Sequence, residues 1–292
     1  MRIEIEHLSF IYSPGLPYET KALDDIDLVL EPGQFTALIG HTGCGKSTLT
    51  QQICGLLQPT SGRVLADGVD INSKTPEARA AKRKIGLVFQ YPEYQLFEET
   101  VLKDVCFGPK NQGFTEEECL AKAKRALQLV GIDPEEKGEE SPFALSGGQK
   151  RRVAIAGVLA MEPELLILDE PTAGLDPKGH SELLEMIDRL QEQTSMSIVL
   201  VSHNMEDVAR LADRVLVMSS GRLVLDGTPR QVYSDSRRLA EYGLMLPQPA
   251  EFMELLAERL GTDAPDTNVL TTEEAAARII GYFEERRQSL QK

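Results

Sequence analysis

The sequence predicts an α/β fold built on a mostly parallel β-sheet. Three short, mostly apolar runs, at residues 35–40, 165–170 and 197–203, have the length and composition of strands that are buried on both faces. Segments with helical spacing separate strands along the chain, as parallel pairing requires. The alternating apolar and polar residues at 2–12 instead predict a half-buried strand, and hence an antiparallel patch beside the parallel sheet.

The other elements follow in chain order. A loop at 14–23 leads to a strand at 26–30, and the Gly-rich stretch after residue 39 leads to a helix at 46–57. A hairpin turns through Asp67 and Gly68, and a strand follows at 84–90. A helix at 115–131 has acids in its first turn, and residues 213–227 form a second hairpin. Two amphipathic helices, 247–261 and 271–292, end the chain on either side of 262–269.

Composition and charge argue against several functions. A chain of 292 residues suggests one large domain, or a domain with an appendage. Its net charge of −15, from 31 basic and 46 acidic residues, disfavours nucleic acid and anionic lipid as partners. The N-terminal residues do not resemble a signal peptide, and we see no apolar run of the roughly 18 residues that a membrane span needs. The four cysteines lack metal-like spacing, which predicts reduced thiols in the cytosol.

A phosphate-binding loop is the first chemical motif. Residues 40–48, GHTGCGKST, fit the pattern G-x-x-x-x-G-K-[ST] between a strand and a helix. The glycines let backbone N–H groups point at a phosphate, and the helix adds its positive end. We expect Lys46 to contact the β- and γ-phosphates and Ser47 to ligate Mg²⁺. The expected ATP-binding residues of this loop are Gly40, His41, Thr42, Gly43, Cys44, Gly45, Lys46, Ser47 and Thr48.

Two further motifs complete the pattern. The run LLILDE at 165–170 ends in Asp169, expected to hold Mg²⁺, and Glu170, expected to act as general base on the attacking water. The sequence LSGGQ at 145–149 predicts a helix capped by Ser146, with glycines that leave backbone N–H groups open to an anion. Taken alone, LLILDE would be interpreted as the end of a strand and LSGGQ as a capped turn. Their order and spacing over residues 1–230 resemble the ATP-binding-cassette (ABC) family of P-loop NTPases.

The resemblance implies an ABC cassette over residues 1–230, with a helical signature subdomain at about 91–163. It implies a dimer in which the signature residues Ser146, Gly147, Gly148 and Gln149 act in trans on ATP held by a second cassette, which is identical or different. It also assigns roles to single residues. Gln90 would reach Mg²⁺ and water, His203 the γ-phosphate, Asp176 the dimer interface and Tyr12 the adenine. We interpret Cys44 as a small residue that fits within the loop, rather than as a redox switch.

The stretch PEYQLFEETVLKDVCFGP at 92–109 narrows the resemblance. It is similar to the energy-coupling-factor transporter ATPases, and best to the second of their two paired ATPase subunits, which power uptake of vitamins or transition-metal ions. By that resemblance residues 231–292 form a helical extension that adds dimer contacts. A groove near Gln90–Glu99 would take a helix of a transmembrane coupling subunit. We expect Tyr91, Tyr94, Leu96 and Phe97 to line it and Glu93, Glu98 and Glu99 to meet basic partner residues.

For Leu96 and Phe97, packing in the core of the subdomain remains an equal alternative. The resemblance also places the chain at the cytoplasmic face of the cell membrane, with a membrane-embedded substrate-binding subunit as an indirect partner. The sequence leaves three alternative functions open. The chain could be an ATPase of another ABC importer, a soluble ABC ATPase without a transport role, or a nucleotide-gated module that does not hydrolyse ATP. Intact Gln90, Glu170 and His203 argue against the last of these.

Overall fold

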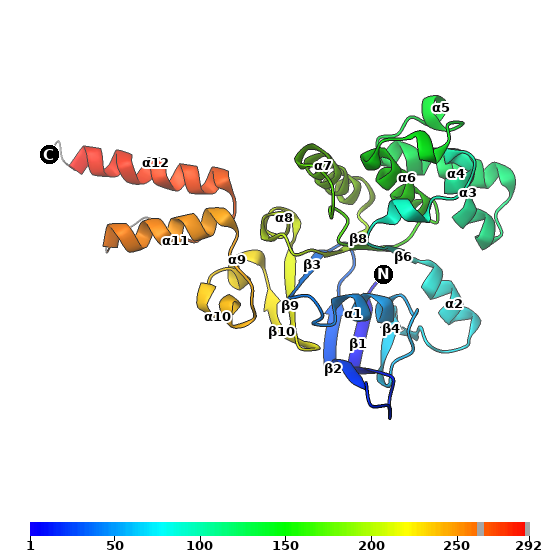
Figure 1. Ribbon diagram of the computed structural model, residues 1–292, viewed down its shortest axis with the longest axis horizontal. Coiled ribbons are helices and arrows are strands. Elements are labelled where there is room, and N and C mark those ends of the chain that lie inside the picture. Colours follow the sequence, from blue (N-terminus) through cyan, green and yellow to red (C-terminus); the bar gives the residue numbers. More distant parts are fainter. Residues whose placement is uncertain (262–265, 290–292) are drawn as a thin grey trace.

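The computed structural model describes residues 1–261 and 266–289, which form two β-sheets (Figure 1). The smaller sheet is antiparallel, in the order β2-β1-β4-β5, and the larger runs β10-β9-β3-β8-β7-β6. Within the larger sheet only the edge strand β10 is antiparallel, so the predicted mostly parallel sheet is confirmed. The strands are β1 Ile3–Tyr12, β2 Thr20–Leu30, β3 Phe35–Ile39, β4 Ser61–Ala66, β5 Val69–Asp70, β6 Ile85–Val88, β7 Leu165–Asp169, β8 Ser197–Val201, β9 Arg214–Ser219 and β10 Arg222–Gly227.

The larger sheet is buried on both faces. Leu166 and Leu168 of β7 pack into a core shared with the helices, whereas Leu165 and Ile167 pack into a core shared with the smaller sheet. Because successive side chains of a strand point to opposite faces, both sets must be apolar. This is why the central strands have continuous apolar sequences, while β1 alternates.

Helices surround the larger sheet and extend the chain at its end. Helices α3 to α6 gather at one end of the molecule, with the long α7 beside them (Figure 1). The helices are α1 Lys46–Ile53, α2 Pro76–Arg83, α3 Val101–Gln112, α4 Glu116–Leu129, α5 Pro134–Lys137, α6 Gly147–Leu159, α7 Pro177–Thr194, α8 Met205–Leu211, α9 Pro229–Val232, α10 Ser236–Glu241, α11 Gln248–Leu260 and α12 Thr272–Ser289, with 3₁₀ turns η1 Pro92–Gln95 and η2 Pro142–Ala144.

Strand β2 is longer than the sequence predicted. The expected loop at 14–23 gives way to strand from Thr20, which pairs with Tyr12 of β1. Register shifts interrupt the β1–β2 ladder at three places, and His7 and Asp25 have left-handed backbone angles, with φ of 48° and 52°. Such bulges break the two-residue alternation by which a strand is recognised.

Helices α11 and α12 project from the body of the protein (Figure 1). At their base, Ala250, Met253 and Ala275 pack in a core that includes Ile39 of β3. On other faces of these helices, four large apolar side chains are exposed: Phe252 at 54%, Leu255 at 56%, Ile280 at 58% and Phe283 at 59%. Parts of the expected linker, 262–265, and of the last predicted helix, 290–292, lie outside the described residues.

Candidate nucleotide-binding and hydrolysis site

The phosphate-binding loop lies between β3 and α1 and depends on its glycines. Gly40, Gly43 and Gly45 have φ of 151°, 81° and 108°. A Cβ at Gly40 would lie 2.3 Å from the Met218 carbonyl oxygen, and one at Gly45 2.6 Å from that of Ala22. Any larger residue would therefore displace β-sheet backbone that supports the loop.

The loop curls around the side chain of Lys46. The Lys46 ammonium donates hydrogen bonds to the carbonyl oxygens of Gly40 at 2.7 Å and His41 at 3.1 Å. Cys44 is 1% exposed, with its Sγ 3.8 Å from Lys46 Nζ. A thiol so enclosed favours the interpretation of Cys44 as a small packing residue. The side chains of His41, Thr42 and Ser47 are exposed, and Thr48 is buried.

Asp169 ends β7 beside this loop. Burial raises the pKa of its carboxyl group, and the charge of Glu170 acts in the same direction, whereas a hydrogen bond with Ser47 and the charge of Lys46 lower it. A cation close to Asp169 would offset the cost of burying the carboxylate. The Ser47 hydroxyl, the Asp169 carboxylate and the Gln90 amide together offer oxygen ligands, which suit Mg²⁺.

Glu170 stands at the centre of the site. Its backbone is left-handed, with φ of 48°, and its N–H donates to the Val201 carbonyl oxygen at 3.0 Å. Gln90 Nε2 donates to Glu170 Oε2 at 3.0 Å, and His203 Nδ1 lies 3.4 Å from Glu170 Oε1. The ends of β6, β7 and β8 thus bring together the three residues predicted to be catalytic. Their individual roles remain predictions.

Tyr12, at the end of β1, lies beside the start of α1. Its hydroxyl is 3.3 Å from Thr48 Oγ1, and its ring makes an edge contact with Phe10, with the centroids 4.7 Å apart. The ring remains 41% exposed. An exposed aromatic face next to the phosphate loop is suited to stacking on a base.

Three of the four signature residues, Ser146, Gly147 and Gly148, border one hollow of about 470 Å³ together with Asp176. Ser146 Oγ accepts from the Gln149 N–H at 3.3 Å, and Gln149 Oε1 accepts from the Ser146 N–H at 3.0 Å, which forms a capping box at the start of α6. A Cβ added at Gly147 or Gly148 would meet open space, so the hollow reaches the N-terminus of the helix. The predicted cap by Ser146 is confirmed.

Arg151 is a central residue that the sequence analysis missed. It is 2% exposed and donates to both carboxylate oxygens of Glu93, at 3.0 and 2.7 Å. It also donates to the carbonyl oxygens of Pro171 at 2.8 Å and Ala173 at 2.7 Å. Arg151 therefore joins α6, the segment after Gln90 and the loop before Asp176. The available signal was its position on the face of Ile155 and Leu159, at i and i+4 spacing.

The groove predicted near Gln90–Glu99 has a different lining from the one expected. A groove of about 460 Å³ is lined by Leu96, Phe97 and Phe107, among others, but not by Tyr91 or Tyr94. Tyr91 instead lies near Arg151, whose guanidinium carbon is 5.9 Å from the ring centroid. Leu96 is 6% exposed and belongs to the core, whereas Phe97 is 56% exposed and packs edge-on against Phe107.

Among the three acids of this segment, Glu93 was assigned incorrectly, whereas the roles of Glu98 and Glu99 remain predictions. Burial raises the pKa of Glu93, but the hydrogen bonding to Arg151, a backbone hydrogen bond and the charge of Arg151 together outweigh burial and leave this pKa lowered. Arg151 binds both oxygens of Glu93, whose side chain is only 18% exposed, so Glu93 serves a contact within the chain rather than a partner residue. Glu99 Oε2 accepts from Lys103 Nζ at 2.7 Å on the exposed surface, and the charge of Glu98 also acts on Lys103.

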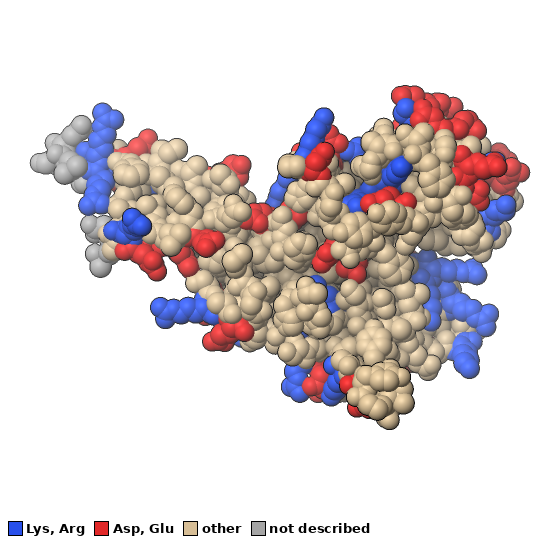
Figure 2. Space-filling model, in the orientation of Figure 1, with Lys and Arg blue, Asp and Glu red and all other residues tan. Residues whose placement is uncertain are grey.

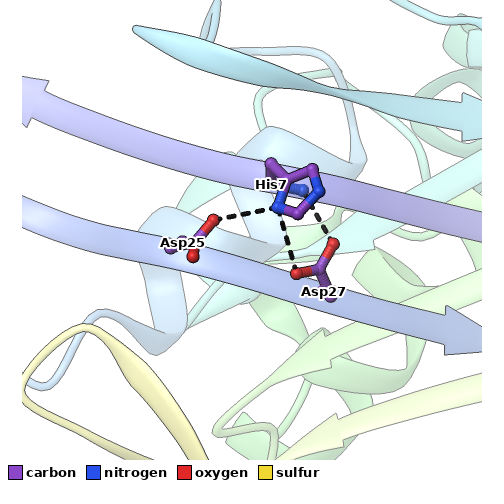
Figure 3. Close-up of side chains that lie close together, drawn as sticks. All are labelled: His7, Asp25 and Asp27. Carbon is purple, nitrogen blue, oxygen red and sulfur yellow. Dashed lines mark hydrogen bonds and ion pairs between the residues drawn. The ribbon is translucent and has the colours of Figure 1, made fainter.

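A cluster of His7, Asp25 and Asp27 lies on β1 and β2, on the exposed surface (Figure 3). Its ligand atoms are close enough to share a metal ion, and this is the one such group within residues 1–261 and 266–289. His7 Nδ1 lies 3.1 Å from Asp25 and 3.4 Å from Asp27. The hydrogen bond with Asp25 and the charges of both acids raise the pKa of His7. These contacts between the ring and the two carboxylates account for the arrangement without a metal ion.

No helix in the described part of the chain is both long and apolar enough to cross a membrane. The charged side chains are spread over the visible face, with an acidic group over α4 and α5 and a basic group around α2 (Figure 2).

The sequence and structure resemble known proteins over most of their length. The sequence model of the family described as ABC transporter matches residues 23–173. The energy-coupling factor transporter ATP-binding protein EcfA2 of Clostridium tetani is 54% identical over 97% of this chain and 98% of its own. EcfA2 of Clostridium perfringens is 55% identical over 85% of this chain and 87% of its own.

Two solved structures are similar in fold. The first is cbiO1 from Clostridium perfringens, described as part of the ABC transporter complex cbiONQ. It superposes with a TM-score of 0.72, is 40% identical, and the match covers 86% of this chain and 98% of that one. The second is a dimer of the ATP-binding cassette MJ0796 in a post-hydrolysis state, bound to ADP and Pi. It has a TM-score of 0.68 and 28% identity over 78% of this chain and 98% of that one.

Proposed function

Because the chain belongs to the ABC transporter family, as an ATP-binding protein of the energy-coupling factor type, we propose that it binds and hydrolyses ATP to drive import across a membrane. The observation that carries the proposal is the placement of Glu170 between Gln90 Nε2 and His203 Nδ1, beside the phosphate loop. A carboxylate held there by two polar side chains is in position to take a proton from a water molecule.

The hydrolytic step follows from this geometry. The Glu170 carboxylate accepts a proton from water as the water oxygen attacks the γ-phosphorus, and the bond from that phosphorus to the departing ADP oxygen breaks. Lys46 leaves its contacts with the Gly40 and His41 carbonyl oxygens and binds the β- and γ-phosphates. Mg²⁺, held by Ser47, Asp169 and Gln90, would neutralise charge on the phosphates. Gln90 and His203 orient the water, and Tyr12 stacks on the adenine.

A second cassette completes the site. The hollow beside Ser146, Gly148 and Asp176 has the features of an anion site, namely a capped helix N-terminus with glycines that leave it open. We infer that it receives the γ-phosphate of ATP held by the other cassette, which is either a second copy or a related chain. The dimeric state of the MJ0796 cassette supports this inference.

The C-terminal extension, residues 231–292, adds to the contact between cassettes. Exposed Phe252 and Leu255 on α11, with Ile280 and Phe283 on α12, offer apolar area that a monomer would leave in water. We expect Phe252→Ser with Phe283→Ser to raise the dissociation constant of the nucleotide-free dimer at least about tenfold. Sedimentation velocity measures this.

The matched control for that measurement is Leu120→Ser on α4, which removes an exposed apolar side chain outside the extension. The dissociation constant of its dimer should equal that of the wild-type dimer. A double variant that dimerises as well as Leu120→Ser would show that the extension has another purpose.

The groove lined by Leu96, Phe97 and Phe107 is the proposed docking site for a helix of a transmembrane coupling subunit. An exposed aromatic pair in a concave site is the kind of contact that dominates interfaces. We expect Phe97→Ser to weaken binding of that subunit about 10- to 30-fold and to leave ATP affinity unchanged. Capture of the subunit by tagged chain, with Leu120→Ser as control, measures this. Equal capture by the two variants would place the docking site elsewhere.

The chain would then act at the cytoplasmic face of the membrane. A separate membrane protein would bind the substrate, a vitamin or a transition-metal ion, and ATP hydrolysis by this chain would drive its import. To test this, tagged chain is purified from membranes of its source, and ATPase activity is assayed in the eluate. A second cassette ATPase and an integral membrane protein should co-elute. Elution with ribosomes would favour a soluble ABC ATPase, and elution with a periplasmic-type import complex would favour another ABC importer.

A further inference from the structure

A buried carboxylate connects two segments of the site. His180, in the first turn of α7, lies with its Nε2 2.9 Å from Oδ2 of Asp207, in the first turn of α8. Asp207 is 4% exposed. Burial raises the pKa of Asp207, while the hydrogen bond and charge of His180 lower it. A carboxylate at this depth needs a hydrogen-bond donor, and His180 provides one.

A rigid turn links Asp207 to His203. Asn204 caps α8, and its Oδ1 accepts from the N–H groups of Glu206 at 2.9 Å and Asp207 at 3.2 Å. The N–H of Asn204 in turn donates to Ser202 Oγ at 3.0 Å. His203 lies inside this hydrogen-bonded turn, so the bonds on either side of it hold its backbone in place relative to Asp207.

On the other side, His180 is linked to the hollow beside the signature. Its N–H donates to the Asp176 carbonyl oxygen at 2.9 Å, and Asp176 Oδ1 accepts from the Gly179 N–H at 2.7 Å. Asp176 and Gly179 border the same hollow as Ser146. The His180–Asp207 contact therefore connects the hollow that receives one nucleotide with the histidine that serves the other.

We propose that His180 is a positioning residue, which acts through Asp207 to hold His203 against Glu170 and so makes hydrolysis at one site respond to the occupant of the hollow beside Asp176. The inference rests on the proposed function. The distance of 3.4 Å from His203 Nδ1 to Glu170 Oε1 is just longer than that of an ordinary hydrogen bond, so a small displacement would decide whether one forms.

Two substitutions separate positioning from simple loss of structure. In His180→Phe the ring is retained but the donor to Asp207 is lost, whereas in His180→Gln an amide donor is retained. We expect kcat for ATP hydrolysis to fall about tenfold or more in His180→Phe, with KM changed by less than about twofold, and His180→Gln to recover most of the loss. Both are assayed as full chains in the assembled dimer, at a temperature at which near-UV circular dichroism shows them folded.

The chain offers a matched control. His7→Phe removes another histidine that is paired with carboxylates, on β1 and β2, and should leave kcat unchanged. Equal kcat in His180→Phe and wild type, or equal losses in His180→Phe and His180→Gln, overturns the positioning role. The same preparations include Glu170→Gln, and ATPase activity that survives this change would overturn the proposed function instead.

Discussion

Glu170→Gln is expected to lower kcat for ATP hydrolysis by about 10²- to 10⁴-fold and to leave ATP affinity near that of the wild type. The amide keeps the size of the side chain and an oxygen for the Gln90 amide to donate to, but it cannot take a proton from water. The left-handed backbone at residue 170 is equally accessible to glutamine, so the local fold should persist. Because the change acts only in the transition state, KM should move far less than kcat.

A control for this experiment lies at the opposite end of the same strand. Glu164 precedes β7, pairs with Lys84 at 2.7 Å and lies at the edge of the sheet away from the phosphate loop. Glu164→Gln removes the same charge from the protein and should retain wild-type kcat. Steady-state phosphate release and equilibrium binding of a fluorescent ATP analogue measure the two quantities. Comparable activity in the two variants would rule out Glu170 as the general base.

Arg151→Met is expected to be the most destabilising single change, lowering the free energy of unfolding by about 3–5 kcal/mol. Methionine fills much of the volume but leaves the Glu93 carboxylate, whose side chain is 18% exposed, without its partner. The carbonyl oxygens of Pro171 and Ala173 lose their donor as well. Urea unfolding followed by circular dichroism gives the free energy, and the slope with urea should stay constant.

Arg63→Met tests whether burial is the cause. Arg63 also pairs with a glutamate, Glu6, at 2.6 Å, but both side chains are well exposed, at 57% and 42%. Solvent and salt weaken such a pair, and its loss should change the unfolding midpoint little. If the two arginine variants unfold at the same urea concentration, Arg151 contributes no more than a surface pair. The double variant Arg151→Met with Glu93→Gln removes the carboxylate as well. If its free energy of unfolding falls only a little, the unpaired Glu93 carboxylate is the cause of the destabilisation in Arg151→Met.

Local sequence was sufficient for the sheet and for the phosphate loop. The apolar residues of β7 predicted burial on both faces, and the spacing of Gly40, Gly45 and Lys46 predicted the loop between a strand and a helix. These features depend on neighbours in the chain, so a short window contains the information. The capping box of Ser146 and Gln149 is local in the same sense, and its helix begins where expected.

Contacts between residues far apart in the sequence could not be predicted from short segments. Arg151 and Glu93 are 58 residues apart, and His180 and Asp207 are 27 apart. No pattern within the segment 91–99 shows that Glu93 points inward to a buried guanidinium rather than outward to a partner. The bulges of β1 and β2 were missed for a related reason, because they are defined by pairing between strands.

The outward course of α11 and α12 has a consequence for the timing of the reaction cycle. At about 1.5 Å per residue, the 18 residues of α12 reach about 27 Å from its base. In the dimer proposed above, two cassettes joined through this extension would stay tethered after ATP is hydrolysed and their nucleotide faces part. The faces then meet again at a high effective concentration, which for a short tether is on the order of millimolar. Re-closure becomes independent of how many copies of the protein the cell holds.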